Sequence, residues 1–375
     1  MENIYFDNSA TTKIYRAALK KYVEVSENLY ENSSALHIGG INAEREIEKS
    51  RRIVARSFGA STDEIIFTSG GTEGDNMAIL GVAYANSRKG KHIITSSIEH
   101  HAVLHTCQHL EKEGFEVTYI KPQKDGKIDP LDVEQAIRHD TILISVMSAN
   151  NETGVFQPIN EIKALCGDII LHTDAVQAYG KMNFSDINAD LITVSAHKVH
   201  GPKGVGTLYV KKGTKITPVI FGGNQDGILH SGTMNTPAIS SFAKAVEIFN
   251  ANLEKNIVYL KSLRSYMIEK LNSIDDILIN GYDAVNVVNV SFKGVRGEVL
   301  LHSLESEGIY VSTGSACNSK STDISYVISS MGVPREFAEG TIRISFSEFN
   351  TKEEIDFTVE KIENILNLLR RFKRR

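Results

Sequence analysis

The sequence predicts an α/β fold, with a mostly parallel β-sheet covered by helices and a smaller α+β unit after it. Short apolar runs rich in β-branched residues alternate with helical patterns over roughly 150 residues, as in a parallel sheet. The runs are almost continuously apolar, which is typical of strands covered on both faces. We expect strands at residues 64–68, 91–95, 116–120, 141–147, 168–172, 190–194 and 206–210.

The pattern changes near residue 236. Thr236-Pro237 is expected to cap a helix and to begin its first turn. Apolar residues then follow at intervals of three and four from Ile239 to Leu271, which predicts one long or kinked amphipathic helix. The smaller unit is expected to contain a strand at 286–292, a helix from Glu298, a Ser/Thr/Gly-rich loop at 312–323, a strand at 341–346 and a final helix with a capping box at Thr351 and Glu354.

The composition argues against several classes of protein. The 375 residues carry 41 basic and 46 acidic side chains, and the net charge of −5 argues weakly against a nucleic-acid partner. Three cysteines cannot make a disulfide framework, and their scarcity fits a reducing compartment. No run approaches the ~20 apolar residues of a membrane-spanning helix, and the N-terminus lacks a signal-peptide pattern. We therefore expect a cytoplasmic protein without a membrane partner.

A glycine-rich turn connects the first predicted strand to a helix. The strand at 65–68 leads into Ser69-Gly70-Gly71-Thr72-Glu73, and a helical pattern follows. The first backbone N–H groups of a helix are free to bind an anion. Neither a Walker motif nor G-x-G-x-x-G is present, so the turn indicates a small phosphate cofactor rather than a nucleotide. Such turns also serve helix packing, and the motif alone does not decide between the two roles.

Two charged side chains follow neighbouring predicted strands. Asp174 lies at the end of the strand at 168–172, and Lys198 follows the strand at 190–194. Alone, Lys198 is expected to be a solvated lysine and Asp174 a helix cap. Together with a phosphate turn they predict a pyridoxal 5'-phosphate site, in which a lysine forms a Schiff base and an aspartate keeps the ring nitrogen protonated.

Eight motifs in a specific order resemble a known family. They are Asp7-Asn8-Ser9-Ala10-Thr11-Thr12, Phe67-Thr68-Ser69-Gly70-Gly71-Thr72-Glu73, Glu99-His100, Asn150-Asn151-Glu152, Asp174-Ala175-Val176-Gln177, Ser195-Ala196-His197-Lys198, Ser231-Gly232-Thr233 and Gly314-Ser315-Ala316-Cys317. Across nearly its whole length the chain resembles the cysteine desulfurases, which are class V aminotransferases of pyridoxal phosphate fold type I. The Ser-Ala-Cys sequence is similar to that of the nitrogenase-type and housekeeping iron–sulfur branch.

The resemblance implies a fold and an assembly. A large cofactor-binding domain, with a mostly parallel seven-stranded sheet, is expected at residues 13–255. A small α+β domain that carries the catalytic cysteine loop is expected at residues 1–12 and 256–375. In the family, a threonine that matches Thr233 reaches the cofactor phosphate of the other subunit, so the resemblance also implies a homodimer.

The resemblance also implies a role for each site residue. Lys198 is expected to hold the cofactor and to move the α-proton, and His100 to stack on the ring. Arg343, with Asn151 nearby, is expected to bind the substrate carboxylate. The implied cofactor-binding residues are Gly71, Thr72, His100, Asn151, Asp174, Gln177, Ser195, His197, Lys198 and Thr233.

Cys317 is the implied catalytic thiol. The resemblance implies conversion of L-cysteine to L-alanine with a persulfide on Cys317, which passes sulfur to a cluster scaffold or a tRNA-thiolation enzyme. The loop at 312–323 has no large aliphatic side chain, which suits a cysteine that must move. Three alternatives stay open: a selenocysteine lyase, an aminotransferase, and a sulfur-relay subunit without catalysis.

Several other histidines and cysteines have patterns that could indicate function. His101, His105 and His109 have helical spacing, which can bind zinc, but we expect only a polar helix face and no metal. Cys107 and Cys166 lie in apolar patterns and are expected to be buried and structural. His230 stands where the family usually has arginine, which predicts weaker or pH-dependent anion binding there.

Overall fold

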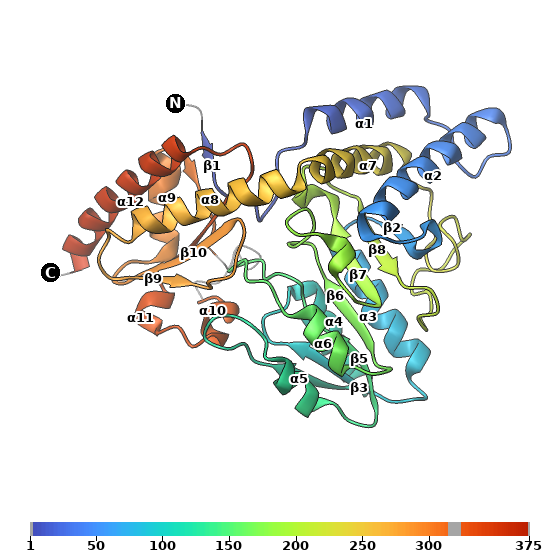
Figure 1. Ribbon diagram of the computed structural model, residues 1–375, viewed down its shortest axis with the longest axis horizontal. Helices are drawn as coiled ribbons and strands as arrows, with labels where there is room; N and C mark the ends of the chain where they lie inside the picture. Colours follow the sequence, from blue (N-terminus) through green and yellow to red (C-terminus); the bar gives the residue numbers. More distant parts are fainter. Residues whose placement is uncertain (1–2, 314–323, 374–375) are drawn as a thin grey trace.

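The computed structural model describes residues 3–313 and 324–373, and its largest sheet has seven strands (Figure 1). Their order across the sheet is β2-β8-β7-β6-β5-β3-β4. β8 is antiparallel to both of its neighbours, and all other pairs are parallel. The seven strands confirm the predicted ones: β2 (Ile65–Thr68), β3 (His92–Ser96), β4 (Glu116–Ile120), β5 (Thr141–Ser145), β6 (Ile170–Asp174), β7 (Leu191–Ser195) and β8 (Gly206–Val210).

Helices cover both faces of this sheet, because consecutive strand residues are apolar and point to opposite sides. Ile66 and Leu191 pack with α3 (Gly71–Asn86) and α4 (His101–Lys112), while Ile65 and Ile192 pack on the other face. The helices on that second face are α2 (Ile38–Phe58), α5 (Pro130–Ala136), α6 (Ile159–Leu165) and α7 (Thr236–Ala251).

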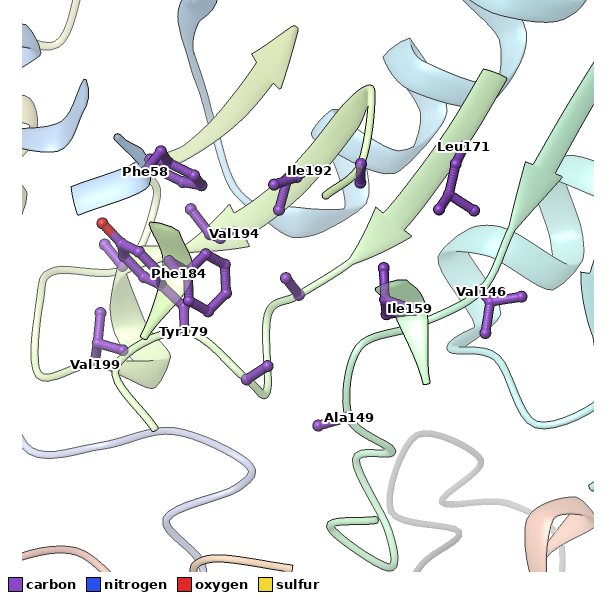
Figure 2. Packing of buried hydrophobic residues seen from close by; sticks show 14 of the residues in the cluster. Phe58, Val146, Ala149, Ile159, Leu171, Tyr179, Phe184, Ile192, Val194 and Val199 are labelled. Atoms are coloured by element: carbon purple, nitrogen blue, oxygen red, sulfur yellow. The ribbon is translucent and has the colours of Figure 1, made fainter. Parts of the chain in front are cut away.

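Aromatic side chains fill one end of the core between this second face of the sheet and its helices (Figure 2). The ring of Tyr179 stacks on Phe58 and meets the edge of Phe184 at a centroid distance of 4.8 Å. Tyr179 belongs to the segment that follows β6, so this packing fixes the chain just beyond Asp174. Short helical turns at η1 (Thr62–Glu64), η2 (Phe184–Asp186) and η3 (Ala196–Lys198) complete the region.

The predicted long helix is two helices. α7 ends at Ala251, and α8 (Leu253–Leu271) continues toward the C-terminal part of the fold (Figure 1). The break lies at Asn252, whose backbone leaves the helical region (φ −121°, ψ 9°) and whose side chain donates to the Ile248 carbonyl. Thr236 is not the N-cap as predicted, because the side chain of Asn235 accepts the Ala238 N–H and caps the helix one residue earlier.

A three-stranded antiparallel sheet forms the smaller α+β domain, in the order β12-β10-β9. The predicted β10 and β12 are confirmed, as is the capping box of the last helix, in which Thr351 N–H donates to the Glu354 carboxylate. The elements are β9 (Ile277–Asn280), β10 (Val287–Phe292), α9 (Gly297–Ser306), α10 (Tyr326–Ser330), α11 (Arg335–Ala338), β12 (Thr341–Ser345) and α12 (Lys352–Lys373).

The N-terminal segment joins this smaller domain. β1 (Ile4–Tyr5) pairs in parallel with β11 (Ile309–Tyr310), and Ile4 and Phe6 share a core with α8 and α12. The chain then crosses to α1 (Arg16–Asn28), which packs beside α7 (Figure 1). None of the helices within the described ranges is both long enough and apolar enough to cross a membrane.

Candidate active site

The predicted site residues gather at the carboxyl edge of the seven-stranded sheet. Asp174 ends β6 and Ser195 ends β7, and these strands are parallel, with Asp174 opposite Thr193. His100 follows β3 and caps the N-terminus of α4. Parallel strands bring their carboxyl ends to one edge, which is where open α/β sheets bind ligands.

Asp174 is a buried carboxylate that faces His100. One carboxylate oxygen accepts the Val176 N–H at 2.9 Å. Asp174 therefore caps the turn that follows β6, and not a helix as the sequence alone suggests. Burial raises the pKa of Asp174, while His100 and Lys198 act to lower it. A buried carboxylate in this position requires a cation or a proton. Asp75 of α3 lies beside it: polar atoms of Asp75, His100 and Asp174 are all within 4.8 Å of one another.

His100 has a defined tautomer. Its Nδ1 accepts the Ala102 N–H at 3.1 Å, so the proton of the neutral ring is on Nε2. Burial lowers the pKa of His100; Asp174 opposes this shift and Lys198 adds to it. At neutral pH the ring is therefore uncharged, with one N–H to donate.

Lys198 is held by backbone carbonyls of the N-terminal segment. Its Nζ donates to Ser9 O at 2.6 Å and to Ala10 O at 3.0 Å. The Gln177 side-chain amide donates to the same Ser9 oxygen at 2.9 Å. The N-terminal segment is thus part of the site, and it brings Lys198 and Gln177 to one point.

The glycine-rich turn has the shape of an anion cradle. A Cβ atom at Gly71 would lie 2.7 Å from the Val176 side chain, and one at Gly206 would lie 2.9 Å from the Gly70 Cα. Glycine therefore allows the start of α3 to approach β8 and the segment after β6. The Ser195 hydroxyl lies 3.7 Å from a Cβ position built on Gly70, beside the free N–H groups of the helix.

Two further phosphate candidates differ in their surroundings. Thr72 is exposed in the first turn of α3. His197 is partly buried and its Nδ1 lies 3.2 Å from the Thr11 hydroxyl. Burial, with smaller contributions from Lys198 and Lys203, lowers the pKa of His197 to about 4. His197 is therefore a neutral donor or acceptor at neutral pH.

Thr233 does not lie with the other predicted cofactor-binding residues. It is exposed, and among the described residues it makes no hydrogen bond to Asp174, His100 or Ser195. His230, on the same segment, is brought close: its Nε2 lies 3.2 Å from Glu73 in the first turn of α3. The hydrogen bond that His230 donates to the Glu73 carboxylate raises the pKa of His230 and lowers that of Glu73 to about 2.

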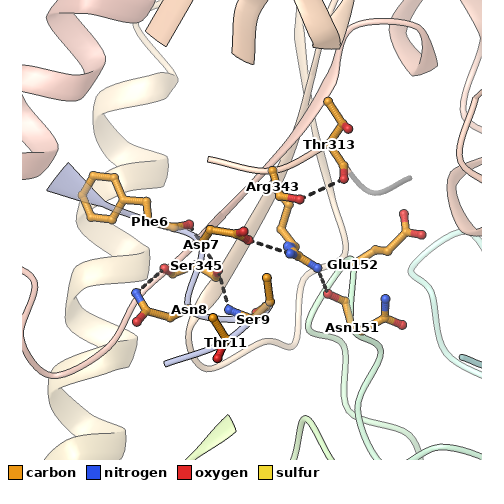
Figure 3. A network of polar contacts seen from close by, with 12 residues as sticks. Phe6, Asp7, Asn8, Ser9, Thr11, Asn151, Glu152, Thr313, Arg343 and Ser345 are labelled. Carbon is orange, nitrogen blue, oxygen red and sulfur yellow. Dashed lines mark hydrogen bonds and ion pairs between the residues drawn. The ribbon is translucent and has the colours of Figure 1, made fainter. Parts of the chain in front are cut away.

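Arg343 and Asn151 lie together at the edge of the smaller domain (Figure 3). Arg343 is almost fully buried on β12, where it donates to the Asn151 carbonyl and to Asp7, both at 2.7 Å. Among the residues that the structure describes, neither the buried Arg343 Nε nor the buried Asn151 Oδ1 has a hydrogen-bond partner. A buried donor and acceptor left unpaired are costly, and a polar ligand with matching groups would satisfy both.

Cys317 lies outside the described residues, but the residues that flank residues 314–323 are fixed at the site. Ser312 pairs with Arg343 through two backbone hydrogen bonds. On the other side, the Ser325 hydroxyl donates to the carboxylate of buried Glu152, and the Tyr326 hydroxyl donates to the Glu99 carbonyl.

Sequence comparison decides the family. The model of the "Aminotransferase class-V" family matches residues 4–357. A cysteine desulfurase IscS of Dictyoglomus turgidum is 45% identical over 375 residues, which cover 98% of this chain and 95% of the relative. The chain belongs to the class V aminotransferases and, among them, to the cysteine desulfurases. The resemblance drawn from the motifs is confirmed.

Solved structures agree with this assignment. A NifS-like protein superposes with a TM-score of 0.92 at 38% identity, over 98% of this chain and 100% of the other. A structure of SspA in complex with cysteine superposes with a TM-score of 0.83 at 35% identity, over 93% of this chain and 100% of the other. The predicted fold class of this desulfurase family member, a mostly parallel α/β domain with a smaller α+β domain, is also confirmed.

The family depends on pyridoxal phosphate, and the site residues fit that cofactor. The buried Asp174 carboxylate needs a positive partner, which a protonated ring nitrogen supplies. The start of α3, with Ser195 beside it, offers donors to a phosphate group. The Lys198 amine is held by the Ser9 and Ala10 carbonyls, near enough to Asp174 to lower the pKa of that carboxyl.

Several polar groups at the site are not predicted by the sequence motifs. Asp75 and Lys181 are buried ionisable residues, but each lies within a helix or turn and has no motif signature. The carbonyls of Ser9 and Ala10 were missed because backbone atoms leave no mark in the side-chain pattern.

Three histidines of α4 have the helical spacing that can bind zinc. His101 and His105 stack on one face of α4 at 4.9 Å, and His109 lies 3.1 Å from Glu113. Within the described ranges, the one group with the geometry of a metal site is that of Asp75, His100 and Asp174.

Cys107 and Cys166 are buried as predicted. Burial raises the pKa of Cys107 to about 12 and that of Cys166 to about 11. Neither thiol is therefore a ready nucleophile, which separates both from the role expected of Cys317.

Proposed function

We propose that the protein is a pyridoxal phosphate-dependent cysteine desulfurase that converts L-cysteine to L-alanine and leaves a persulfide on Cys317. The observation that carries the proposal is the convergence of Lys198, Asp174 and His100 on one carboxyl edge of the sheet. Family membership supplies the chemistry that this geometry supports.

When bound, pyridoxal phosphate supplies an electron sink that makes the α-proton of an amino acid acidic. Asp174 would pair with the ring nitrogen, and His100 would offer its Nε2–H to the cofactor. Gly71, Thr72, Ser195 and His197 would hold the phosphate, and Gln177 would bind the ring hydroxyl. Lys198 holds the cofactor and accepts the α-proton at Nζ, close to the Ser9 and Ala10 carbonyls that orient it.

Substrate binding is assigned to Arg343 and Asn151. Two of the guanidinium nitrogens are already held by Asp7 and the Asn151 carbonyl, so the group cannot swing away. The unpaired Nε donates to the substrate carboxylate, and the unpaired Asn151 Oδ1 accepts from cofactor or substrate.

Sulfur leaves through Cys317. Its thiolate attacks the substrate sulfur, an S–S bond forms as the C–S bond breaks, and the carbon takes up a proton to become alanine. The chain on both sides of residues 314–323 is anchored to Arg343 and Glu152, which supports delivery of the thiol to this place. The persulfide passes to an acceptor protein, either a cluster scaffold or a tRNA-thiolation enzyme.

The proposal extends to assembly. We infer a large domain at 13–255 and a small one at 1–12 and 256–375, because Ile4 and Phe6 share the core of the C-terminal elements. We infer a homodimer from the exposed segment that carries Thr233, where the large apolar side chains of Phe221 and Ile228 are 81% and 74% exposed. A cytoplasmic location, without nucleic-acid or membrane partners, agrees with the charge and with the helices described.

The test compares the wild type with Cys317→Ala, and uses Cys166→Ala as the matched control. Alanine and sulfide are measured after addition of L-cysteine and a thiol reductant, and the cofactor is followed by its absorbance. We expect turnover in the wild type and the control, and loss of both products in Cys317→Ala with the cofactor retained. Alanine release that persists in Cys317→Ala would overturn the persulfide step, and favour a lyase that does not use this thiol.

A further inference from the structure

Lys181 is a buried lysine next to the site, and the proposed reaction does not use it. Its side chain lies in the segment after β6 and is 9% exposed. Nζ donates to the Gln177 carbonyl at 2.7 Å and lies 3.4 Å from the Gln177 Oε1. Both partners are neutral, and no carboxylate of the described chain forms an ion pair with it. A buried ammonium without a counter-ion is costly, which marks it as a candidate for function.

Hydrogen bonds connect Lys181 to Lys198. Lys181 holds the oxygen side of the Gln177 amide, so the amide nitrogen points the other way and donates to Ser9 O at 2.9 Å. The same Ser9 oxygen accepts from Lys198 at 2.6 Å. The two amines also line one small cavity of about 30 Å³, which has room for about one water molecule.

The charges that face Lys181 are positive. Burial, followed by Lys198 and Arg343, lowers the pKa of Lys181 to about 7. The one carboxylate that lines the cavity belongs to Glu348, and it is already occupied by His200 and Tyr15. Asp7, the nearest partner of Arg343, is likewise engaged. Electrostatic influence between like charges is mutual, so Lys181 also acts on Lys198.

We propose that Lys181 is a positioning residue for Lys198, which orients the Gln177 amide and, by its positive charge, lowers the proton affinity of the Lys198 nitrogen. A lysine works as a base or nucleophile only when it is unprotonated, and a neighbouring cation is one way to achieve this near neutral pH. The inference rests on the proposed function, because it assigns Lys198 to the cofactor.

The experiment separates the charge of Lys181 from its hydrogen bond. Lys181→Gln keeps an N–H donor for the Gln177 carbonyl but is neutral, Lys181→Met removes both, and Lys181→Arg keeps the charge. Lys212→Met, at an exposed lysine, is the matched control. The readout is the pH midpoint of the yellow absorbance of the holoenzyme without cysteine, between about pH 5 and pH 10.

We expect Lys181→Gln and Lys181→Met to raise the midpoint by about one pH unit, because a positive neighbour has been removed. Lys181→Arg and Lys212→Met are expected to stay within about 0.3 units of the wild type. The shift should persist in high salt, since buried charges are screened little. If Lys181→Met loses the cofactor, the difference in pH midpoint between Lys181→Gln and Lys181→Arg still tests the effect of the charge.

Two failures are distinguishable. A yellow wild type whose midpoint is unchanged in Lys181→Gln, or equally raised in Lys181→Arg, overturns the charge role of Lys181 and leaves the desulfurase proposal intact. A wild type that takes up no pyridoxal phosphate overturns the proposed function itself.

Discussion

Arg343 donates from Nη2 to Asp7 Oδ1 at 2.7 Å, across 336 residues of sequence. Both groups lie where the smaller domain meets the carboxyl edge of the large sheet. Because the pair is nearly buried, with Arg343 5% and Asp7 22% exposed at the side chain, the guanidinium has a fixed orientation before any substrate arrives.

Substitution of Arg343 should weaken cysteine binding without loss of cofactor. A lysine has one nitrogen and cannot donate to Asp7, the Asn151 carbonyl and the substrate from three fixed positions, so we expect Arg343→Lys to raise KM for cysteine by about 10- to 100-fold. Asp7→Asn keeps an acceptor for Arg343 and should raise KM by less. Steady-state kinetics and a cofactor absorbance spectrum check this, and an unchanged KM in Arg343→Lys would remove it from substrate binding.

The His230–Glu73 pair should make cofactor retention depend on pH. The pKa of His230 is raised in the folded protein. The stabilisation that its ion pair with Glu73 gives to the fold is therefore complete below about pH 6.5, the pKa in the unfolded chain, and is lost as the pH rises through the pKa in the folded protein. Glu73, with its pKa lowered to about 2, stays ionised over that whole range. The ratio of cofactor affinity in His230→Arg to that in the wild type should therefore increase from pH 6 to about pH 9.

His109→Gln is the control for that experiment, because His109 also pairs with a glutamate, but at an exposed position on α4. A ratio that stays constant across the pH range would contradict the role of His230.

Asp226 should anchor the segment that carries His230 and Thr233. Its carboxylate accepts from Arg51 at 2.7 Å and from the Phe67 N–H at 2.8 Å, and its side chain is 4% exposed. Replacement by alanine removes the acceptor of two buried donors, Arg51 Nη2 and the Phe67 N–H, while Arg51 keeps its bonds to Glu48 and the Ile65 carbonyl. The expected loss in the free energy of unfolding is about 1–3 kcal/mol for each donor left without a partner. Denaturant unfolding measures it.

Asp63→Ala is the matched control, because the Asp63–Lys212 contact is exposed and 3.9 Å long. It should change the free energy of unfolding by less than about 0.5 kcal/mol. Equal effects of the two substitutions would mean that Asp226 has no special anchoring role.

Gly206→Ala should damage the phosphate cradle. The added methyl group would lie 2.5 Å from the Val194 carbonyl and 2.9 Å from the Gly70 Cα, so β8 and the turn before α3 must separate. We expect about a tenfold or greater loss of cofactor affinity, together with about 1–3 kcal/mol of stability.

Gly213→Ala is the matched control, because Gly213 lies in the loop that follows β8. Its φ of +89° makes alanine strained, but its Cβ would meet nothing within 4 Å. It should therefore lose stability and keep cofactor affinity. Equal affinity losses in the two variants would show a general effect of destabilisation, and not of the cradle.

The sequence predicts the large sheet well because each of its strands is buried on both faces and reads as a continuous apolar run. β9 was missed because its residues are only partly buried, and so it lacks that contrast with its surroundings. The sequence predicts a long or kinked helix but not the break at Asn252, because the apolar spacing continues across it. The contact that accompanies the break is a single side-chain hydrogen bond, from Asn252 to the Ile248 carbonyl.

Within the site, the side chains that belong to motifs were predicted, and the groups that orient them were not. Asp174 and Lys198 carry the chemistry and can be recognised by type and place. Asp75 and Lys181 act only through their neighbours, and their burial depends on the packing of α3 and the segment after β6, which local sequence does not specify.

The segment 7–12 also sets the order in which the molecule is completed. It pairs with β12 through Asp7 and Ser345, and then supplies the carbonyls that hold Lys198. Residues 341–345 lie far along the chain from this segment, so the two distant parts must fold together before the carbonyls of Ser9 and Ala10 are in place for Lys198. We therefore expect stable loading of the cofactor to follow this long-range pairing.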